Sequence, residues 1–245
     1  MRTVKFAIAS LFYHKKAMTL YTLVSFFAML GLIVTFALIY SLDQVLAQTK
    51  ELLFTDDLQT KVTNELQPIT TLYHQLFYLI FWAYLLVISG FQFYYQLHKR
   101  KEYTAWLTTG SSTRQWVGMQ LVEMWVPLVI AAIAAFSLLM LFQPYFQQEL
   151  LSGHIFALDR ENTSAHIWQN IQSAQNEEFG ITIPQNNQVF VQNVELNSTA
   201  WLSIMFQSTR QAIFTLIATV TSVTCLMVCG HCLYWRKKQW KNQLN

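Results

Sequence analysis

The side chains best suited to metal or redox chemistry gather near the end of the sequence. Cys225, Cys229 and Cys232 recur at i, i+4 and i+7, and His231 lies beside the last of them. On a helix this spacing places three sulfurs on one face, where thiolates and an imidazole could bind a metal ion or exchange electrons. Cysteine is also a small residue that packs readily between helices, and we favour that interpretation.

One acidic residue lies at the edge of an apolar run. An acid inside a membrane helix usually marks a functional site. Glu123, however, comes near the predicted cytosolic edge, where it could reach water or Arg114. We therefore expect a structural or interface role for it. The spans offer no second acid or histidine pair for a membrane protease, and the chain has no GxxxxGK[ST] phosphate loop with which to use ATP by itself. We expect no catalytic residue, metal or cofactor in this chain.

The elements that must position these residues are apolar helices. Of the 245 residues, 53% are hydrophobic and only 12% are charged, which is too apolar for an ordinary soluble domain. Four runs, near 17–42, 72–97, 121–142 and 211–235, have the roughly 20 residues that a helix needs to cross a bilayer. No cleavable signal precedes the first run, so we expect it to be retained.

The charges predict which ends of these helices face the cytosol. Twelve of the sixteen Lys and Arg residues lie in the N-terminal segment, between the second and third runs, or after the fourth. The other two connections hold eleven of the thirteen Asp and Glu residues. Because cytoplasmic segments carry the excess of Lys and Arg, both termini are predicted to be cytosolic. These basic residues flank a lipid bilayer, so we expect no nucleic-acid partner.

The predicted fold is all-α and transmembrane, with four spanning helices and helical extensions outside the membrane. Residues 1–16 predict a cytosolic amphipathic helix, and residues 17–142 hold spans one to three. Within them, residues 43–71 predict an external helical hairpin whose tip lies near 54–57 and whose second helix is kinked by Pro68.

A small α+β extracytoplasmic insertion is predicted at 143–198, between spans three and four. Ser164 could cap a helix that ends at Gly180, and apolar stretches at 181–183 and 189–191 flank a polar turn typical of a hairpin. Residues 199–245 predict a stalk helix, span four and a basic cytosolic tail. Without glycine or proline before Gly230, one helix of roughly 55 Å could cover 199–236.

The connection between spans two and three, at 98–120, is predicted to form a two-helix elbow. Tyr103, Trp106 and Leu107 give a bulky apolar face to a short helical extension of span two. Gly110 can take the left-handed conformation that ends a helix, and Ser111, Ser112 or Thr113 can cap the next. A rigid elbow with exposed aromatics suits docking to another protein. The alternative is a plain loop whose aromatic side chains lie among lipid headgroups.

The sequence of this elbow resembles the FtsX/MacB-type (type VII) ABC transporter permeases. That family has a basic-Glu cluster, an apolar helix turn, a small-residue break, and an Arg-Gln pair ahead of a Leu-Glu. The matching residues here are His98-Lys99-Arg100-Lys101-Glu102, Trp106-Leu107-Thr108-Thr109-Gly110-Ser111-Ser112, Arg114-Gln115 and Leu121-Val122-Glu123. The basic amphipathic start followed by Lys15-Lys16-Ala17-Met18-Thr19-Leu20 is also similar. Familiar members place their large external domain between spans one and two, whereas here the longest loop lies between spans three and four.

The resemblance implies a permease subunit in a bacterial plasma membrane, docked on a separate cytosolic ABC ATPase that binds ATP and Mg. The ATPase-docking residues would be Lys101, Glu102, Tyr103, Trp106, Leu107, Gly110 and Arg114. A second permease subunit, identical or different, would complete the complex. ATP-driven closure would move the extracytoplasmic helices, for export or removal of a peptide, antimicrobial or lipid-linked substrate.

Two other functions remain open at this point. An FtsX-like regulatory scaffold would transmit the same ATPase motion to an extracellular cell-wall hydrolase or another external peptide or protein. A membrane enzyme would instead use the cysteine–histidine cluster, and replacing Cys225, Cys229 and Cys232 by serine would abolish its activity.

Overall fold

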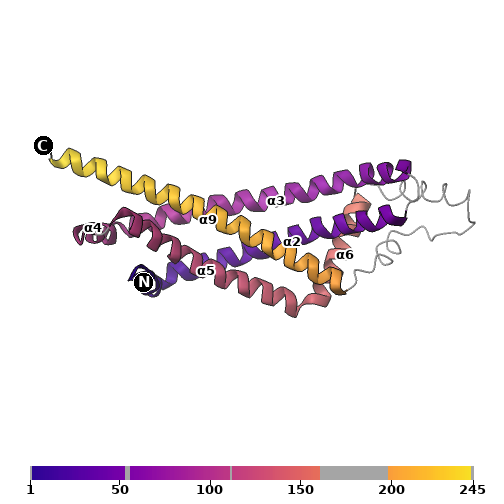
Figure 1. Cartoon of the computed structure of the whole chain (residues 1–245), viewed down its shortest axis with the longest axis horizontal. Helices are drawn as coiled ribbons and strands as arrows, with labels where there is room; N and C mark the ends of the chain where they lie inside the picture. Colours follow the sequence, from indigo (N-terminus) through magenta and orange to yellow (C-terminus); the bar gives the residue numbers. More distant parts are fainter. Residues whose placement is uncertain (1, 53–55, 111, 161–197, 244–245) are drawn as a thin grey trace, which may run out of the picture. The chain divides into compact units, whose positions relative to one another are not determined.

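The computed structural model describes residues 2–52, 56–110, 112–160 and 198–243. These residues form helices only, and no strand occurs among them (Figure 1). In chain order the helices are α1 (Arg2–Tyr13), α2 (Lys15–Leu52), α3 (Asp56–His98), α4 (Arg100–Thr108), α5 (Thr113–Leu141), α6 (Gln143–Arg160) and α9 (Ser198–Gln243).

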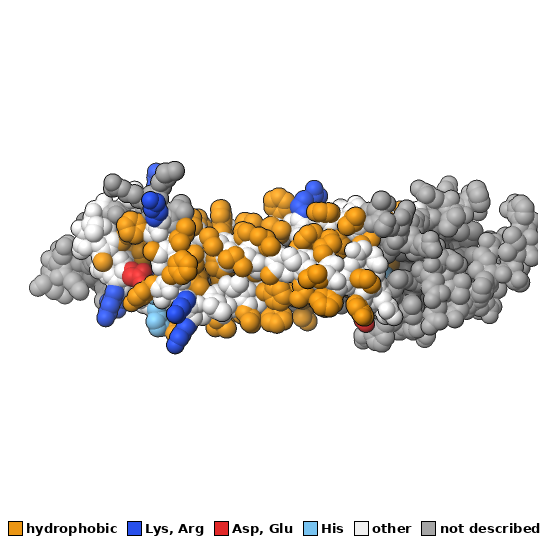
Figure 2. All heavy atoms as spheres, turned by 90° about the horizontal axis from the view of Figure 1, so that it is seen from below, with side chains coloured by type: hydrophobic (Ala, Val, Ile, Leu, Met, Phe, Trp, Pro, Cys, Tyr) orange, Lys and Arg blue, Asp and Glu red, His pale blue; other side chains and the backbone are white. Residues whose placement is uncertain are grey.

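Four of these helices are long and apolar enough to cross a membrane, which confirms the predicted number of spans. The apolar stretches are Lys15–Gln44 of α2, Gln67–His98 of α3, Thr113–Leu141 of α5 and Ala200–Tyr234 of α9. Their outer surfaces carry large apolar side chains such as Leu86, Phe93 and Leu226, each more than half exposed. Hydrophobic side chains accordingly cover much of the described surface in Figure 2. This architecture suits a multi-pass membrane protein.

Helices α2, α3 and α9 continue beyond their apolar stretches, as the sequence predicts. Helix α2 runs to Leu52 and α3 begins at Asp56, so the connection predicted at 43–71 is helical on both sides of residues 53–55, which lie outside the described part. Helix α3 passes through Pro68 without ending. Helix α9 is one uninterrupted helix of 46 residues, longer than the predicted 199–236.

The segment after span three is described only in its first part. Helix α6 fills the first part of the predicted α+β insertion, and Pro144 stands in its first turn, where a proline has no backbone hydrogen bond to lose. The helix predicted after Ser164 and the hairpin predicted around 181–191 fall in residues 161–197, which lie outside the described part of the chain.

The chain divides into two compact units. Unit 1 consists of Met1–Gly31, Ile80–Ser137 and Ala212–Asn245. It therefore contains the N-terminal segment, the elbow and the C-terminal segment, the three regions that the charge pattern places in the cytosol. Buried polar contacts join its spans: Gln92 Nε2 donates to Thr224 Oγ1 at 3.0 Å, and Tyr21 OH donates to the carbonyl of Met124 at 3.2 Å. Such contacts are a common means of joining helices in membranes.

Unit 2 consists of Leu32–Leu79 and Leu138–Gln211. Its parts of α2 and α3 pack through Phe36 and Phe77, whose ring centroids are 5.2 Å apart. Helix α6 packs on α9 through Phe146 against the fully buried Trp201, at 5.6 Å between centroids. Because these large rings fill the space between helices, α6 belongs to the core of this unit.

Candidate functional site: a buried ion pair beneath the elbow

The elbow turns at a glycine and restarts at a capping box. Gly110 has a φ of 75°, the left-handed conformation that glycine adopts without a steric penalty. The hydroxyl of Ser112 then accepts from the N–H of Gln115 at 3.4 Å, and the Gln115 side chain accepts from the N–H of Ser112 at 3.2 Å. These reciprocal bonds satisfy two N–H groups at the start of α5. The predicted helix end at Gly110 and the predicted cap are both confirmed.

The aromatic side chains of the elbow pack inward. Tyr103 and Trp116 are 6% and 1% exposed, and their rings lie 5.4 Å apart. Trp106 packs against the same cluster, 6.0 Å from Trp116 and 5.7 Å from Phe6 of α1. Ala7 of α1 and Val228 and Cys232 of α9 complete this core. The elbow is therefore fixed to α1 and α9 as well as to α5.

Below this core lies a fully buried ion pair. Lys99, the single residue between α3 and α4, places its Nζ 2.6 Å and 2.5 Å from the two carboxylate oxygens of Glu123 on α5. Both side chains have no exposed surface. Tyr95 donates its hydroxyl hydrogen to Glu123 Oε2 at 3.0 Å, so the carboxylate is bonded from two directions.

The same ammonium group also reaches α1 and α4. Lys99 Nζ donates to Ser10 Oγ at 2.6 Å and lies 3.7 Å from Glu102 Oε2. The other oxygen of Glu102 is 2.8 Å from Nε2 of His14, the residue between α1 and α2. The Lys99 charge also lies 4.9 Å from the centroid of the Tyr95 ring, within the range of a cation–π contact.

The Lys99 network should hold the elbow rigidly against the neighbouring helices. Burying two charges is costly, and the cost is offset only when the pair is close and its remaining hydrogen-bonding positions are filled. Here the ammonium group has three oxygen acceptors within 2.6 Å, on Ser10 and Glu123, and four helices contribute to the network. A displacement of α4 relative to α3 or α5 would separate these charges in a fully buried site. The elbow must therefore move together with the helices that it joins, or leave a buried charge unpaired.

The structure places the predicted docking residues in two groups. Lys101, Gly110 and Arg114 are exposed, and Glu102 is partly exposed although paired. Tyr103 is buried and Trp106 packs into the core, so the predicted exposed aromatic face is wrong. The aromatic face is buried by tertiary packing, because α1 and α9 cover the side of α4 that would be exposed in an isolated helix. The side chain of Leu107 lies outside the described part of the structure.

The predicted surroundings of Glu123 are also wrong. Glu123 is buried and pairs with Lys99, whereas Arg114 is exposed on the first turn of α5. Lys99 was grouped with the basic cluster and its partner was missed, because helical spacing within one segment carries no information on the register between α3 and α5. Two features of the sequence could have indicated the pair. Glu123 is the single acidic residue of α5, and Lys99 is the first basic residue after α3.

The cysteine–histidine cluster gains no support as a metal site. Cys232 is buried in the elbow core, Cys225 is partly buried, and Cys229 is exposed. Among the residues that the structure describes, no group of three His, Cys, Asp or Glu side chains could hold a metal ion. The role of Cys232 in this core matches the packing interpretation.

Unit 2 contains a second buried polar cluster, on α6. His154 is 6% exposed, its Nε2 lies 2.8 Å from Ser41 Oγ on α2, and its Nδ1 lies 2.7 Å from the Tyr73 hydroxyl on α3. Ser41 donates its own hydroxyl hydrogen to the carbonyl of Leu38 at 3.1 Å, so its oxygen accepts from Nε2–H and Tyr73 donates to Nδ1. Burial lowers the pKa of His154 to about 4. This neutral imidazole ties α6 to α2 and α3.

The Lys99–Glu123 network and the His154 cluster are defined by their contacts in this structure alone. No protein-family model, curated protein or solved structure matches this chain.

Proposed function

We propose that this chain is the permease subunit of an ABC transporter of the FtsX/MacB type, embedded in a plasma membrane with both termini in the cytosol. In this proposal a separate cytosolic ATPase docks on the elbow formed by α4 and the start of α5. ATP hydrolysis in that partner moves α2, α3, α5 and α9 as mechanical levers. The observation that carries the proposal is the Lys99–Glu123 ion pair, which joins the elbow to the spans.

A mechanical role requires a joint that does not bend under load. The Lys99 network and the Tyr103–Trp116 core would pass a displacement of α4 directly into α3, α5 and α1. The extended lengths of α2, α3 and α9 would then carry it beyond the membrane. The proposed work is therefore movement of external helices, consistent with export or removal of an amphiphilic substrate at the outer surface.

The proposed docking surface is polar and basic. Lys101 and Arg114 flank the exposed Gly110 turn on two successive helices, and Thr108 and Thr109 beside them are also exposed. An ATPase surface with acidic residues would complement these charges. Unit 1 contains the elbow together with both termini, which agrees with a single cytosolic side for all three.

The experiment that tests this proposal is purification of the tagged chain, in mild detergent, from the cells that make it. We expect a soluble ATPase with a phosphate-binding loop to co-purify in stoichiometric amount, as identified by mass spectrometry. The double substitution Lys101→Glu and Arg114→Glu is expected to remove most of this ATPase, because it reverses two charges on the surface without disturbing a buried contact. Circular dichroism of the variant should match that of the unsubstituted chain.

The matched control is Lys15→Glu with Lys16→Glu. It reverses the same number of exposed basic charges at the start of α2, outside the proposed docking surface on α4 and the start of α5. This variant should retain the ATPase. Purification without any ATPase would contradict the proposed function, and equal loss with both variants would contradict docking at the elbow.

A further inference from the structure

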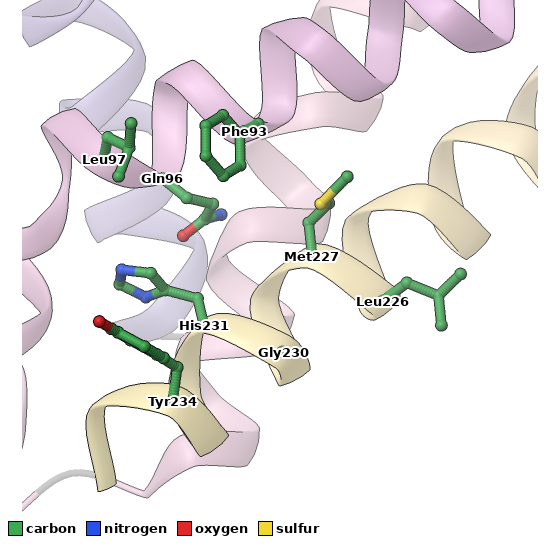
Figure 3. Close-up of a pocket in the computed structure, with 8 residues that line it drawn as sticks. All are labelled: Phe93, Gln96, Leu97, Leu226, Met227, Gly230, His231 and Tyr234. Atoms are coloured by element: carbon green, nitrogen blue, oxygen red, sulfur yellow. The ribbon is translucent and has the colours of Figure 1, made fainter. Parts of the chain in front are cut away.

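Two adjoining cavities lie between α3 and α9 within unit 1. The first has a volume of about 440 Å³ and is lined by Phe93, Gln96, Leu97, Leu226, Met227, Gly230, His231 and Tyr234 (Figure 3). The second, of about 480 Å³, shares Leu226 and Met227 with the first and continues along both helices toward Phe81 and Thr215. Together they accompany α9 from Thr215 to Tyr234, a length on the order of 28 Å at 1.5 Å per residue. One leaflet of a bilayer core is about 15 Å deep, so this space is long enough for an acyl chain.

The floor of the first cavity carries an unused hydrogen-bond acceptor. Gln96 is 3% exposed, and its Nε2 donates to Gln120 Oε1 at 3.2 Å. Its Oε1 has no hydrogen-bond partner among the described residues. In Figure 3 the Gln96 side chain points into the space between α3 and α9. An amide oxygen left without a donor in a nonpolar site is unfavourable, and an incoming N–H or O–H group would remove this cost.

A basic side chain, Arg100, lies near the end of the cavity that the charge pattern places in the cytosol. Arg100 is exposed, follows Gln96 by one helical turn, and is close enough to act electrostatically on His231. Basic groups at the cytosolic ends of membrane helices attract anionic lipid headgroups.

We propose that these cavities form a binding site for one anionic phospholipid with a hydroxyl-bearing headgroup, of the phosphatidylglycerol kind. An acyl chain occupies the apolar space along α3 and α9. A headgroup hydroxyl donates to Gln96 Oε1, and the phosphate lies beside Arg100. The inference rests on the membrane placement in the proposed function and is independent of the ATPase.

Four lipids with identical acyl chains distinguish the contribution of the negative charge from that of the hydrogen bond to Gln96. Phosphatidylglycerol offers negative charge and a donor, phosphatidylmethanol negative charge alone, phosphatidylethanolamine a donor without net charge, and phosphatidylcholine neither. The delipidated chain in detergent is titrated with each lipid, and native mass spectrometry counts the lipids bound per chain. We expect one phosphatidylglycerol per chain, bound about three- to tenfold more tightly than phosphatidylmethanol, the effect of one hydrogen bond. Phosphatidylcholine should bind most weakly.

Substitution of Gln96 tests the assigned acceptor. Gln96→Leu should abolish the preference for phosphatidylglycerol over phosphatidylmethanol, since both lipids keep their charge. Gln92→Leu is the matched control: Gln92 is buried one turn earlier on α3 and also has an unpartnered Oε1, but it does not line the cavity. This control should keep the preference.

A steric substitution tests the site if Gln96→Leu cannot be isolated. A Cβ at Gly230 meets no atom within 4 Å, so Gly230→Leu can fill the first cavity and should lower phosphatidylglycerol binding about tenfold. Gly118→Leu, at an equally open glycine on α5, should not.

Two results would overturn the proposal. The first is equal binding of all four lipids, or a preference that survives both Gln96→Leu and Gly230→Leu. The second is absence of bound lipid together with a dimer that Gly230→Leu dissociates, which would assign the cavities to a second copy of the chain. Because the chain is studied alone, neither result depends on whether an ATPase partner exists.

Discussion

Lys99 Nζ lies within 2.6 Å of both carboxylate oxygens of Glu123, and neither residue has any exposed surface. One member of the pair joins α3 to α4, and the other is on α5. Removing one partner leaves an uncompensated charge in a fully buried site, whereas removing both leaves none. The pair is therefore strongly coupled, and this coupling can be measured.

We expect Lys99→Met alone to lower the free energy of unfolding by about 3–5 kcal/mol, because Glu123 is left buried and unpaired. The double variant Lys99→Met with Glu123→Leu should recover most of this loss. The measurement is equilibrium unfolding in mixed micelles, arranged as a double-mutant cycle. Additive effects of the two substitutions would show that the charges do not interact in the folded protein.

The same double variant separates docking from transmission. With the charges removed, the exposed residues Lys101 and Arg114 are unchanged, so the proposed ATPase should still bind. The junction is weaker, so nucleotide-dependent changes in hydrogen exchange over residues 32–52 of α2 should become smaller than in the unsubstituted complex. Equal exchange changes in both proteins would indicate that the ion pair stabilises the fold without transmitting movement.

At the elbow, Gly110→Ala should destabilise the protein by about 1–2 kcal/mol, because a φ of 75° brings a Cβ too close to the backbone. Gly118→Ala provides the control within α5, where the glycine is helical and a Cβ meets no atom within 4 Å. There alanine should be neutral or stabilising by up to about 1 kcal/mol. Thermal unfolding of both variants would measure the difference, and equal destabilisation would contradict the assigned role of the Gly110 turn.

Local patterns in the sequence were sufficient to predict the helices and the turn of the elbow. The four apolar runs, the uninterrupted stretch before Gly230, and the Gly110–Ser112 break each depend on residues close together in the chain. The Lys99–Glu123 pair, the burial of Tyr103 and the His154 cluster depend on contacts between residues far apart in the chain, for example 24 positions for Lys99 and Glu123 and 113 for Ser41 and His154. Such contacts are set by the register and rotation of neighbouring helices, which hydrophobic periodicity in one helix does not specify.

Helix α6 was missed for a related reason. Residues 143–160 mix apolar and polar side chains, with Ser152-Gly153 near the middle, and glycine disfavours a helix by about 1 kcal/mol relative to alanine. In the structure a Cβ at Gly153 would lie 3.7 Å from Leu38 on α2, an ordinary van der Waals contact, so packing does not require the glycine. Helix α6 is stabilised by tertiary contacts, such as that of Phe146 with Trp201, which the local sequence does not indicate.

Trp106→Ala should destabilise the protein rather than only release a partner. Its ring packs between Phe6 and Trp116, and loss of a half-buried tryptophan is expected to cost about 2 kcal/mol, below the 3–5 kcal/mol of a fully buried one. Trp82→Ala removes a ring that is 57% exposed and should change stability by less than about 0.5 kcal/mol. Detergent unfolding monitored by circular dichroism compares the two, and equal effects would contradict the packing assigned to Trp106.

His154 predicts how the stability of unit 2 depends on pH. Its pKa is about 4 in the folded protein and 6.5 in a model peptide, because burial disfavours the imidazolium. Between these values the unfolded chain binds a proton that the folded chain does not. The free energy of unfolding should therefore fall by about 1.4 kcal/mol per pH unit as the pH drops from 6.5 toward 4, and this stabilisation is fully present above pH 6.5.

Protonation would also change a specific contact. Nδ1 accepts from the Tyr73 hydroxyl, so once Nδ1 carries a proton this hydroxyl must turn and accept instead. His154→Gln should remove most of the acid-dependent loss, whatever its effect on stability at pH 7. His74→Gln, which replaces an exposed histidine on α3, should leave the pH dependence unchanged. Unfolding measured at pH 4.5, 5.5 and 7 tests this, and a slope that persists in His154→Gln would place the acid-sensitive group elsewhere in the protein.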